Sequence, residues 1–377
     1  MQVISDPRIF PQSELAPTAQ HAGWYRWVED SLVGATGRES AAADAALRRD
    51  FLESLLAGNV AVLGQALSGA PSAAVYRHLL RLLSLSWRHL AAGTPGQLTA
   101  HGFAIPVVIV CSAASAQESP ATLESAAISA LLRAHGALGG NETFGVANVL
   151  AGAGAVGIHS LPHWLGWRNT LDRATALREV EPAVLRIAGG QESAHVAYLI
   201  GTALAAPEAR LFDESGTGAW GMPLAQMLSR HLAVPGAQVL ALPRGVADPV
   251  AAEQIGLVAQ REIALQLFAS NAIRESRATF GEPTAVLSVH RLGRGGELRL
   301  SISSPFGERE AAGFRCPLFP FERVEEVLEI VVALLRACRV ADIRVMSGIH
   351  GDRDLRTGLT LLFRADAVGP GESVAYH

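Results

Sequence analysis

The sequence predicts a protein of the mixed α/β (α+β) class, with a helical N-terminal region, a central α/β region and a C-terminal domain of the ferredoxin-like, split βαβ type. Three observations predict this class. The first hundred residues show helical periodicity, a continuous apolar run typical of a buried strand follows, and strand and helix patterns then alternate along the rest of the chain. We expect the three parts at residues 1–100, 101–235 and 236–377.

The N-terminal region is expected to consist of helices. Residues 24–33 and 40–69 carry apolar residues at helical spacing, and Ser40 is a candidate N-cap. A further helix is expected over residues 73–93. Its apolar stripe consists of Val75, Leu79, Leu82, Leu83 and Leu90. No polar cluster in this region points to chemistry, so we expect a helical layer or a small bundle.

The central region begins with a strand pattern. Residues 103–113, FAIPVVIVCSA, form the apolar, β-branched run expected of a strand buried on both faces. Ser119 and Pro120 then match the N-cap and N1 positions of a helix over residues 121–138. Further strand patterns are found at residues 194–205 and 237–243, with a helix pattern at residues 220–233 between them.

The C-terminal region carries the clearest pattern. The strand at residues 237–243 begins this region. Asp248 and Pro249 then open a long helix, and two strands follow, separated by RLGRGG. In the second strand apolar and polar residues alternate from Glu297 to Ser303, as in a half-buried antiparallel strand. The remaining elements are a helix at residues 321–340 and a second hairpin with strands at residues 342–350 and 358–366. This order predicts the ferredoxin-like arrangement with one extra edge strand.

Composition excludes several functions. The chain has 377 residues, of which 49% are hydrophobic and 18% charged, so we expect sizeable buried cores. A net charge of -4 gives no broad basic field, and nucleic acid is not an expected partner. The chain contains no lysine. Schiff-base enzymes, P-loop enzymes and protein kinases, which need one, are therefore excluded.

Cysteine usage and the first residues bear on location. The three cysteines, Cys111, Cys316 and Cys338, are too few and too far apart for a disulfide scaffold, and the N-terminus lacks the pattern of a secretion signal. We expect a cytoplasmic protein. Residues 143–167 carry no charge, but they include two histidines, a proline and five glycines, so a membrane helix is not expected. An alternative is a peripheral membrane contact around Trp164 and Trp167.

A glycine-rich segment offers the most specific local motif. Residues 152–157, GAGAVG, match the GxGxxG pattern of dinucleotide-binding loops, in which Gly152, Gly154 and Gly157 would approach a pyrophosphate. The context fits poorly, because Pro162 falls where the following helix should be in its second turn. The alternative is a small-residue surface for close packing of helices or backbone.

Two groups of residues are candidate metal ligands. His159 and His163 have the i,i+4 spacing of helical zinc ligands, although Pro162 lies between them and the glutamate of an HExxH motif is absent. His350, Asp352 and Asp354 lie together in a predicted hairpin loop and could hold magnesium. In both places helix-entry or turn-forming roles are the alternative.

Other residues are candidates for catalysis or anion binding. Cys111 ends a predicted strand, where His135 or His195 could act as its base, but a small core cysteine is the simpler interpretation. Glu192 and His195 are candidates for general acid–base work. Arg291 and Arg294 could clamp an anion, or they could be solvated turn residues.

The sequence thus favours a non-catalytic binding or assembly subunit of a larger complex, with a protein partner or a second copy of the chain. The motivation is the excluded chemistry together with small-residue segments such as residues 146–157, which suit close packing. The alternative is an enzyme of oxidoreductase type that binds a dinucleotide at the GAGAVG segment. The sequence names no cofactor beyond that alternative.

Overall fold

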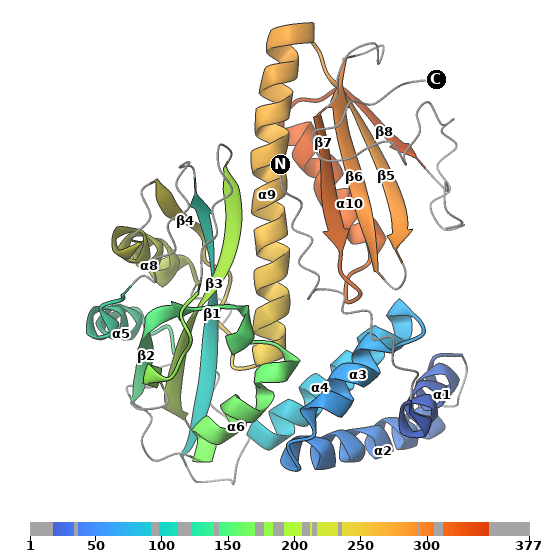
Figure 1. Ribbon diagram of the computed structural model, residues 1–377, viewed down its shortest axis with the longest axis vertical. Coiled ribbons are helices and arrows are strands. Elements are labelled where there is room, and N and C mark those ends of the chain that lie inside the picture. The colour runs from blue at the N-terminus through green and yellow to red at the C-terminus, as the bar shows by residue number, and fades with distance from the viewer. Residues whose placement is uncertain are drawn as a thin grey trace. The chain divides into compact units, whose positions relative to one another are not determined.

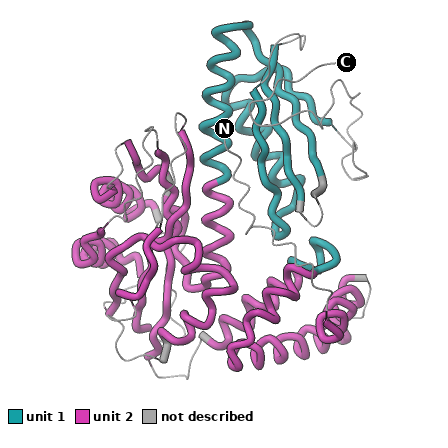
Figure 2. The backbone as a smooth tube through the Cα atoms, viewed as in Figure 1, with its two compact units in different colours: residues 1–14, 70–77, 261–377 teal, residues 15–69, 78–260 magenta. Residues whose placement is uncertain are grey.

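The computed structural model divides the chain into two compact units (Figure 2). Unit 1 comprises residues 1–14, 70–77 and 261–377, and unit 2 comprises residues 15–69 and 78–260. The boundary expected near residue 100 lies within unit 2. The structure describes residues 18–33, 37–91, 98–111, 122–138, 143–169, 177–183, 192–205, 212, 217–232, 236–292, 295–304 and 312–346.

Helices make up the N-terminal part, as the periodicity predicts. They are α1 (Ala19–Val33), α2 (Gly37–Leu56), α3 (Val60–Ser68) and α4 (Ala73–Ala91). Ser40 lies inside α2, and the helix expected over residues 40–69 is interrupted after α2, where Gly58 has a φ of 72°. Four residues of the predicted stripe on α4 are buried: Val75, Leu79, Leu82 and Leu83.

Two aromatic side chains of α1 form hydrogen bonds to neighbouring helices of unit 2. Trp24 donates its indole N–H to Asp50 Oδ2 at 3.0 Å, and the Tyr25 hydroxyl donates to the Ala66 carbonyl at 2.7 Å. Each ring buries its apolar body while its polar atom is satisfied. These contacts join α1 to α2 and α3.

The first sheet belongs to unit 2 and has the strand order β2-β3-β1-β4 (Figure 1). The strands are β1 (Thr99–Cys111), β2 (Phe144–Ala151), β3 (Ser193–Ala205) and β4 (Ala237–Ala241). Every pairing is antiparallel. Residues 102–111 of the central strand β1 are all buried, which confirms the interpretation of the apolar run.

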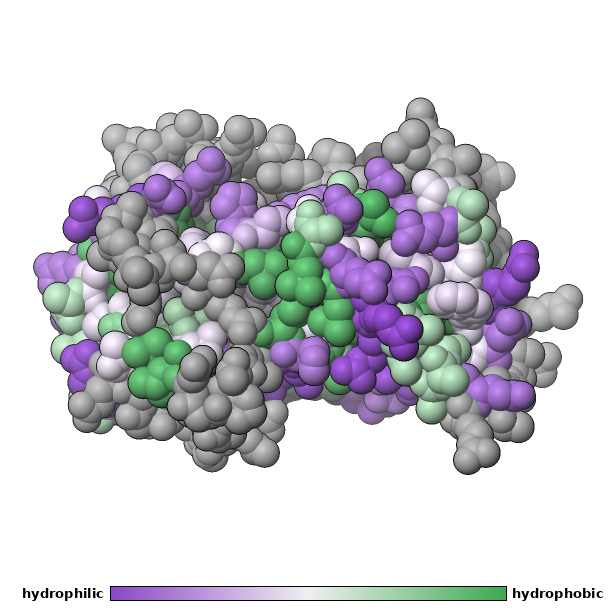
Figure 3. Space-filling view, turned by 90° about the horizontal axis from the view of Figure 1, so that it is seen from below, coloured by the Kyte–Doolittle hydropathy of each residue, from purple (hydrophilic) through white to green (hydrophobic). Residues whose placement is uncertain are grey.

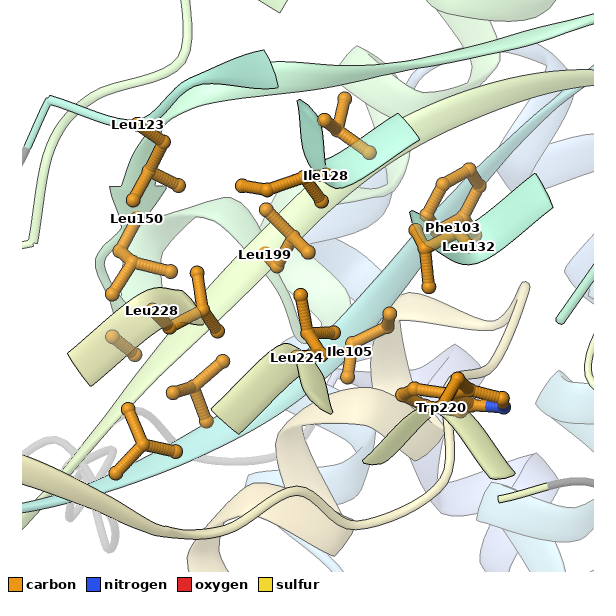
Figure 4. Close-up of a cluster of buried hydrophobic side chains, with 14 of the residues drawn as sticks. Phe103, Ile105, Leu123, Ile128, Leu132, Leu150, Leu199, Trp220, Leu224 and Leu228 are labelled. Atoms are coloured by element: carbon orange, nitrogen blue, oxygen red, sulfur yellow. The ribbon is translucent and has the colours of Figure 1, made fainter. Parts of the chain in front are cut away.

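Helices α5 (Ser125–Ala134) and α8 (Thr217–His231) cover one face of this sheet (Figure 4). Ser119 and Pro120, the predicted start of the first of these helices, lie outside the described residues. The buried cluster joins apolar residues of both helices to alternate residues of the strands. Its members include Phe103, Ile105, Ile128, Leu132, Leu199, Trp220, Leu224 and Leu228.

On the opposite face of this sheet, aromatic rings occupy space that glycines leave free. A Cβ atom at Gly102 in β1 would lie 2.8 Å from Cε3 of Trp164, which belongs to α6 (Leu161–Asn169). A Cβ atom at Gly256 would lie 2.5 Å from the hydroxyl oxygen of Tyr198. Helices α6 and α9 (Pro249–Phe280) therefore approach this face closely, because glycines leave room for the rings.

Helix α9 (Pro249–Phe280) begins as the sequence predicts. Asp248 is its N-cap, since Oδ1 accepts the N–H groups of Val250 at 3.0 Å and Ala251 at 3.2 Å. Pro249 occupies the first helical position, where its missing N–H costs nothing. Residues of α9 up to Gln260 belong to unit 2, and those from Arg261 belong to unit 1.

The second sheet belongs to unit 1 and has the strand order β7-β6-β5-β8. Its strands are β5 (Thr284–Leu292), β6 (Gly295–Ser303), β7 (Ala312–Leu318) and β8 (Asp342–Met346). Strands β5 and β6 form the predicted antiparallel hairpin, and Leu298, Leu300 and Ile302 are buried. These residues pack in one core with α9 and with α10 (Val324–Ala337).

The structure does not confirm the ferredoxin-like detail. Residues 237–241 pair with β1 in the first sheet, so the strand expected to begin the C-terminal domain belongs to the other unit. The second sheet instead contains β7, which the sequence did not reveal, and β8 lies parallel to β5. The second strand of the hairpin predicted after residue 342 lies outside the described residues. What holds is a mixed helix and strand architecture with two small sheets.

The uncharged segment at residues 143–167 is broken into short elements. It contains β2, two short 3₁₀ turns, η1 (Ala153–Ala155) and η2 (Ile158–Ser160), and most of α6. Within the described parts of the chain, no helix combines the length and the apolar character that crossing a membrane requires.

Candidate functional site

The GAGAVG segment packs against the start of α9. Gly157 has a φ of 82°, and its N–H donates to the carbonyl of Pro249 at 2.8 Å. A Cβ atom on Gly157 would lie 2.5 Å from Oε2 of Glu253. Gly152 would meet Ala183 at an ordinary 3.7 Å, and Gly154 faces open space. Only Gly157 is thus required by both its backbone conformation and its neighbours.

This geometry gives no support to a dinucleotide loop. Such a loop joins a parallel strand to a helix whose first-turn amides face the pyrophosphate. Here β2 pairs antiparallel with β3, and two 3₁₀ turns separate it from α6. The dinucleotide alternative remains an untested prediction.

The candidate metal ligands are not gathered into a site. His159 lies in η2 with its ring 3.4 Å from the place of a Cβ atom on Gly64, and His163 is exposed on α6. Among the described residues no group of three or more histidine, cysteine or acidic side chains could hold a metal ion. His350, Asp352 and Asp354 lie outside the described residues, as does Arg294, and only the backbone of Arg291 is described.

Cys111 and His195 lie near each other on paired strands but are poorly suited to nucleophilic catalysis. Cys111 is opposite Ser193 in the sheet register, and the Ser193 hydroxyl lies 2.9 Å from Nε2 of His195. Burial raises the pKa of the Cys111 thiol, which disfavours the reactive thiolate. Burial also lowers the pKa of His195. Glu192 is exposed, and His135 is exposed at the end of α5.

A polar pair that the sequence did not reveal lies beneath Gly157. Tyr198 is fully buried, and its hydroxyl has no hydrogen-bond partner among the described residues. Burial raises the pKa of Glu253 to about 7, and burial together with the charge of Glu253 raises the pKa of Tyr198. Because the carboxylate of Glu253 lies against Gly157 and beside Tyr198, we assign it a role in the packing of α9.

A cleft along the edge strand β2 is the best candidate for a binding site. Its volume is about 460 Å³, and we name it the β2 cleft. It is lined by residues of α5, β2 and β3 and of the segment at residues 177–183. The lining residues are Ser125, Ala126, Ser129, Thr143, Phe144, Gly145, Val146, Asn148, Leu177, Arg178 and Thr202.

The floor of the β2 cleft depends on a glycine. Gly145 in β2 is the register partner of Thr202 in β3, so the two lie side by side on one face of the sheet. Because Gly145 has no side chain, Thr202 behind it still lines the cleft. Thr202 is only 2% exposed, and it lies on the face of the sheet opposite α5, because Ala203 and Leu199 belong to the core that α5 and α8 cover.

The outer edge of β2 is covered beyond the cleft. Val149 forms a bridge with Thr122, and Ala151 forms one with Pro182. The backbone N–H of Leu123 donates to the Asn148 carbonyl at 2.7 Å, and that of Ala183 donates to the Leu150 carbonyl at 2.6 Å. The strand left along the cleft is too short for a partner to add a strand of its own, which favours a small ligand.

Sequence reasoning missed the β2 cleft because its residues come from separate segments with no motif in any of them. The sequence predicted no strand at residues 144–151, so Gly145 was not recognised as a glycine within a strand, which often marks a close approach of another group. No family model, curated protein or solved structure matches the chain.

Proposed function

We propose that the chain is a non-catalytic binding or assembly subunit that holds a small molecule in the β2 cleft. The observation that carries the proposal is the kind of group that lines the cleft. Hydroxyls, an amide and a guanidinium face it, and its described lining contains no carboxylate, imidazole or thiol. Such groups donate hydrogen bonds and orient a ligand, but they supply neither a nucleophile with its base nor a general acid.

The size of the cleft supports a small-molecule ligand. Pockets that hold such ligands measure roughly 300–1,000 Å³ and combine apolar walls with a few polar groups. Here Phe144, Val146 and Leu177 provide the apolar walls, and the volume of about 460 Å³ lies within that range.

A thermal-shift screen tests the proposal. The wild type would be heated with a panel of phosphorylated, carboxylated, amino and neutral small molecules. Ala126 and Ala130 are both exposed on α5, but only Ala126 lines the cleft, so Ala126→Trp fills the cleft while Ala130→Trp serves as the matched control. We expect at least one class to raise the melting temperature of the wild type and of Ala130→Trp but not of Ala126→Trp. Equal shifts in all three proteins, or none, would contradict the proposal.

Exposed apolar groups support the assembly part of the proposal. Leu56, Leu98 and Met222 of unit 2 are 71%, 64% and 68% exposed. The face of the molecule in Figure 3 carries apolar surface between polar areas. Sedimentation velocity over a range of concentrations tests for self-association, and a species of monomer mass at every concentration would count against a homo-oligomer.

A further inference from the structure

We propose that residues 153–160, which include η1 and η2, form a pH-dependent latch on the first turns of α9. The latch is closed while the carboxyl group of Glu253 is protonated, and it opens locally when that group is ionised. Both parts belong to unit 2. This inference is independent of the β2 cleft and goes beyond the proposed function, because it describes a conformational change that no ligand drives.

The closed latch is held at Gly157. The N–H of this residue donates to the Pro249 carbonyl at 2.8 Å, and its carbonyl accepts the Ser160 hydroxyl at 2.8 Å. The carboxyl group of Glu253 fills the space of the missing side chain, since its carbon and both oxygens lie within 2.7 Å of the place of a Cβ atom on Gly157. The backbone of the latch therefore excludes water from one side of this carboxyl group.

Two polar groups lie at this contact without partners. Glu253 forms no hydrogen bond or ion pair with a described residue, and the buried hydroxyl of Tyr198 forms none either. Burial raises the pKa of Glu253 to about 7. A neutral carboxyl group tolerates such a place, whereas a carboxylate needs water or a counter-charge. Ionisation therefore favours the conformation in which water reaches Glu253.

No group among the described residues supplies that counter-charge. The titratable and charged groups of the packed elements are Tyr198 of β3, His159 of η2, His163 of α6, Asp248 at the start of α9 and Arg88 of α4. The ring of His159 lies against α3, and His163 and Arg88 are exposed. Burial, together with the charge of Glu253, raises the pKa of Tyr198, so that its hydroxyl stays neutral.

The latch can separate from α9 without unfolding of the sheet below it. Its ring contacts are that of His159 with Gly64 of α3 and the hydrogen bond of 2.9 Å from the Trp164 indole N–H to the Ala155 carbonyl. Strands β1 and β3, in contrast, are paired over their whole lengths. We therefore expect the latch to open at a lower free energy than the unfolding of unit 2.

Hydrogen–deuterium exchange of the full chain, read by mass spectrometry between pH 5 and 8, tests the proposal. The wild type is compared with Glu253→Gln at each pH, so that the pH dependence of the chemical exchange step cancels. The closed state holds the proton of Glu253 more tightly than the open state, so opening increases as the pH rises through about 7. We expect the exchange of residues 153–160, relative to Glu253→Gln, to rise at least tenfold over this range.

Three control variants separate Glu253 from its surroundings. His159→Gln removes the imidazole of the latch, and Tyr198→Phe removes the hydroxyl without a partner. Both should keep the pH dependence of the wild type, and so should Glu53→Gln on an exposed site of α2. Glu253→Met has a side chain of similar length without charge, and it gives the same comparison if Glu253→Gln does not fold.

The strands provide the reference for local opening. We expect β1 to stay protected in the same samples while residues 153–160 exchange. Exchange of the two segments at one rate would overturn the latch, because Glu253 would then act only on the unfolding of unit 2. Equal exchange of the wild type and the neutral variants at every pH would also overturn it, as would loss of the pH dependence in His159→Gln or Tyr198→Phe.

Discussion

Gly157 shows how one residue of the glycine-rich segment differs from its neighbours. An alanine there would need a positive φ and would place its Cβ against the carboxylate of Glu253, whereas Gly154 faces open space. We expect Gly157→Ala to lower the free energy of unfolding by at least about 2 kcal/mol. Gly154→Ala should change it by less than about 0.5 kcal/mol.

Urea unfolding followed by circular dichroism measures both glycine variants. The packing interpretation predicts a clear difference between them. Equal stability of the two variants would mean that Gly157 can move away from α9 at no cost, and the contact with Glu253 would not be part of the folded state.

Glu253 should make stability depend on pH. Burial raises its pKa in the folded state to about 7 from an ordinary value of 4.5, so the folded protein holds the proton more tightly than the unfolded chain. The contribution of Glu253 to the free energy of unfolding is complete below pH 4.5 and is lost as the pH rises through about 7. The full change is roughly 3 kcal/mol, and Glu253→Gln should remove it and be more stable than the wild type at pH 8.

Chemical denaturation at several pH values between 5 and 8 tests this prediction. Burial also raises the pKa of Asp248, but that residue is present in both proteins, so their difference isolates Glu253. Glu53→Gln, on an exposed site of α2, is the control and should follow the wild type. If the free energies of unfolding of Glu253→Gln and the wild type changed with pH in the same way, Glu253 would not be the source of the pH dependence.

At the scale of elements, one buried ion pair joins α9 to the turn before α10. Arg261 is 3% exposed and donates two N–H groups to the carboxylate of Glu322, one of them at 2.7 Å. It also donates to the Pro317 carbonyl at 3.1 Å and lies over the Phe319 ring. The bonds to Glu322 raise the pKa of Arg261 despite its burial, so the pair stays charged.

Removing one partner of this pair should destabilise unit 1. We expect Glu322→Gln to cost about 3 kcal/mol, because it leaves the arginine charge buried without a counter-ion. The control is Glu326→Gln, since Glu326 pairs with Arg323 at 3.9 Å where both side chains are exposed, and such pairs contribute at most about 1 kcal/mol. Thermal unfolding of both variants measures the difference, and equal melting temperatures would refute a structural role for the pair.

Element types followed from local patterns, but their partners did not. The apolar run of β1, the alternation in β6 and the Asp248 cap of α9 each depend on neighbouring residues, and the structure confirms all of them. β7 was missed because Gly313 and Pro317 interrupt its pattern. The pairing of β4 with β1, across more than a hundred residues, leaves no local signal.

For the whole molecule, the predicted class holds and the division of the chain into units differs from the simple order along the sequence. Residues 70–77, which include the first turn of α4, belong to unit 1, although the residues on both sides belong to unit 2. The candidate residues chosen from motifs do not come together in one site among the described residues. The β2 cleft instead combines residues between 125 and 202 that share no motif. Tertiary contacts, not spacing along the chain, create that cleft.

Native mass spectrometry of the purified full chain tests the central claim most directly, because it reports a retained small molecule together with the mass of the assembly. The account predicts that the wild type and Ala130→Trp retain a bound small molecule and that Ala126→Trp does not. It also predicts that the bound molecule is not converted into a product during prolonged incubation. A wild type without ligand when supplied with the compounds of the thermal-shift panel, or conversion of the bound molecule into a product, would contradict a non-catalytic binding role.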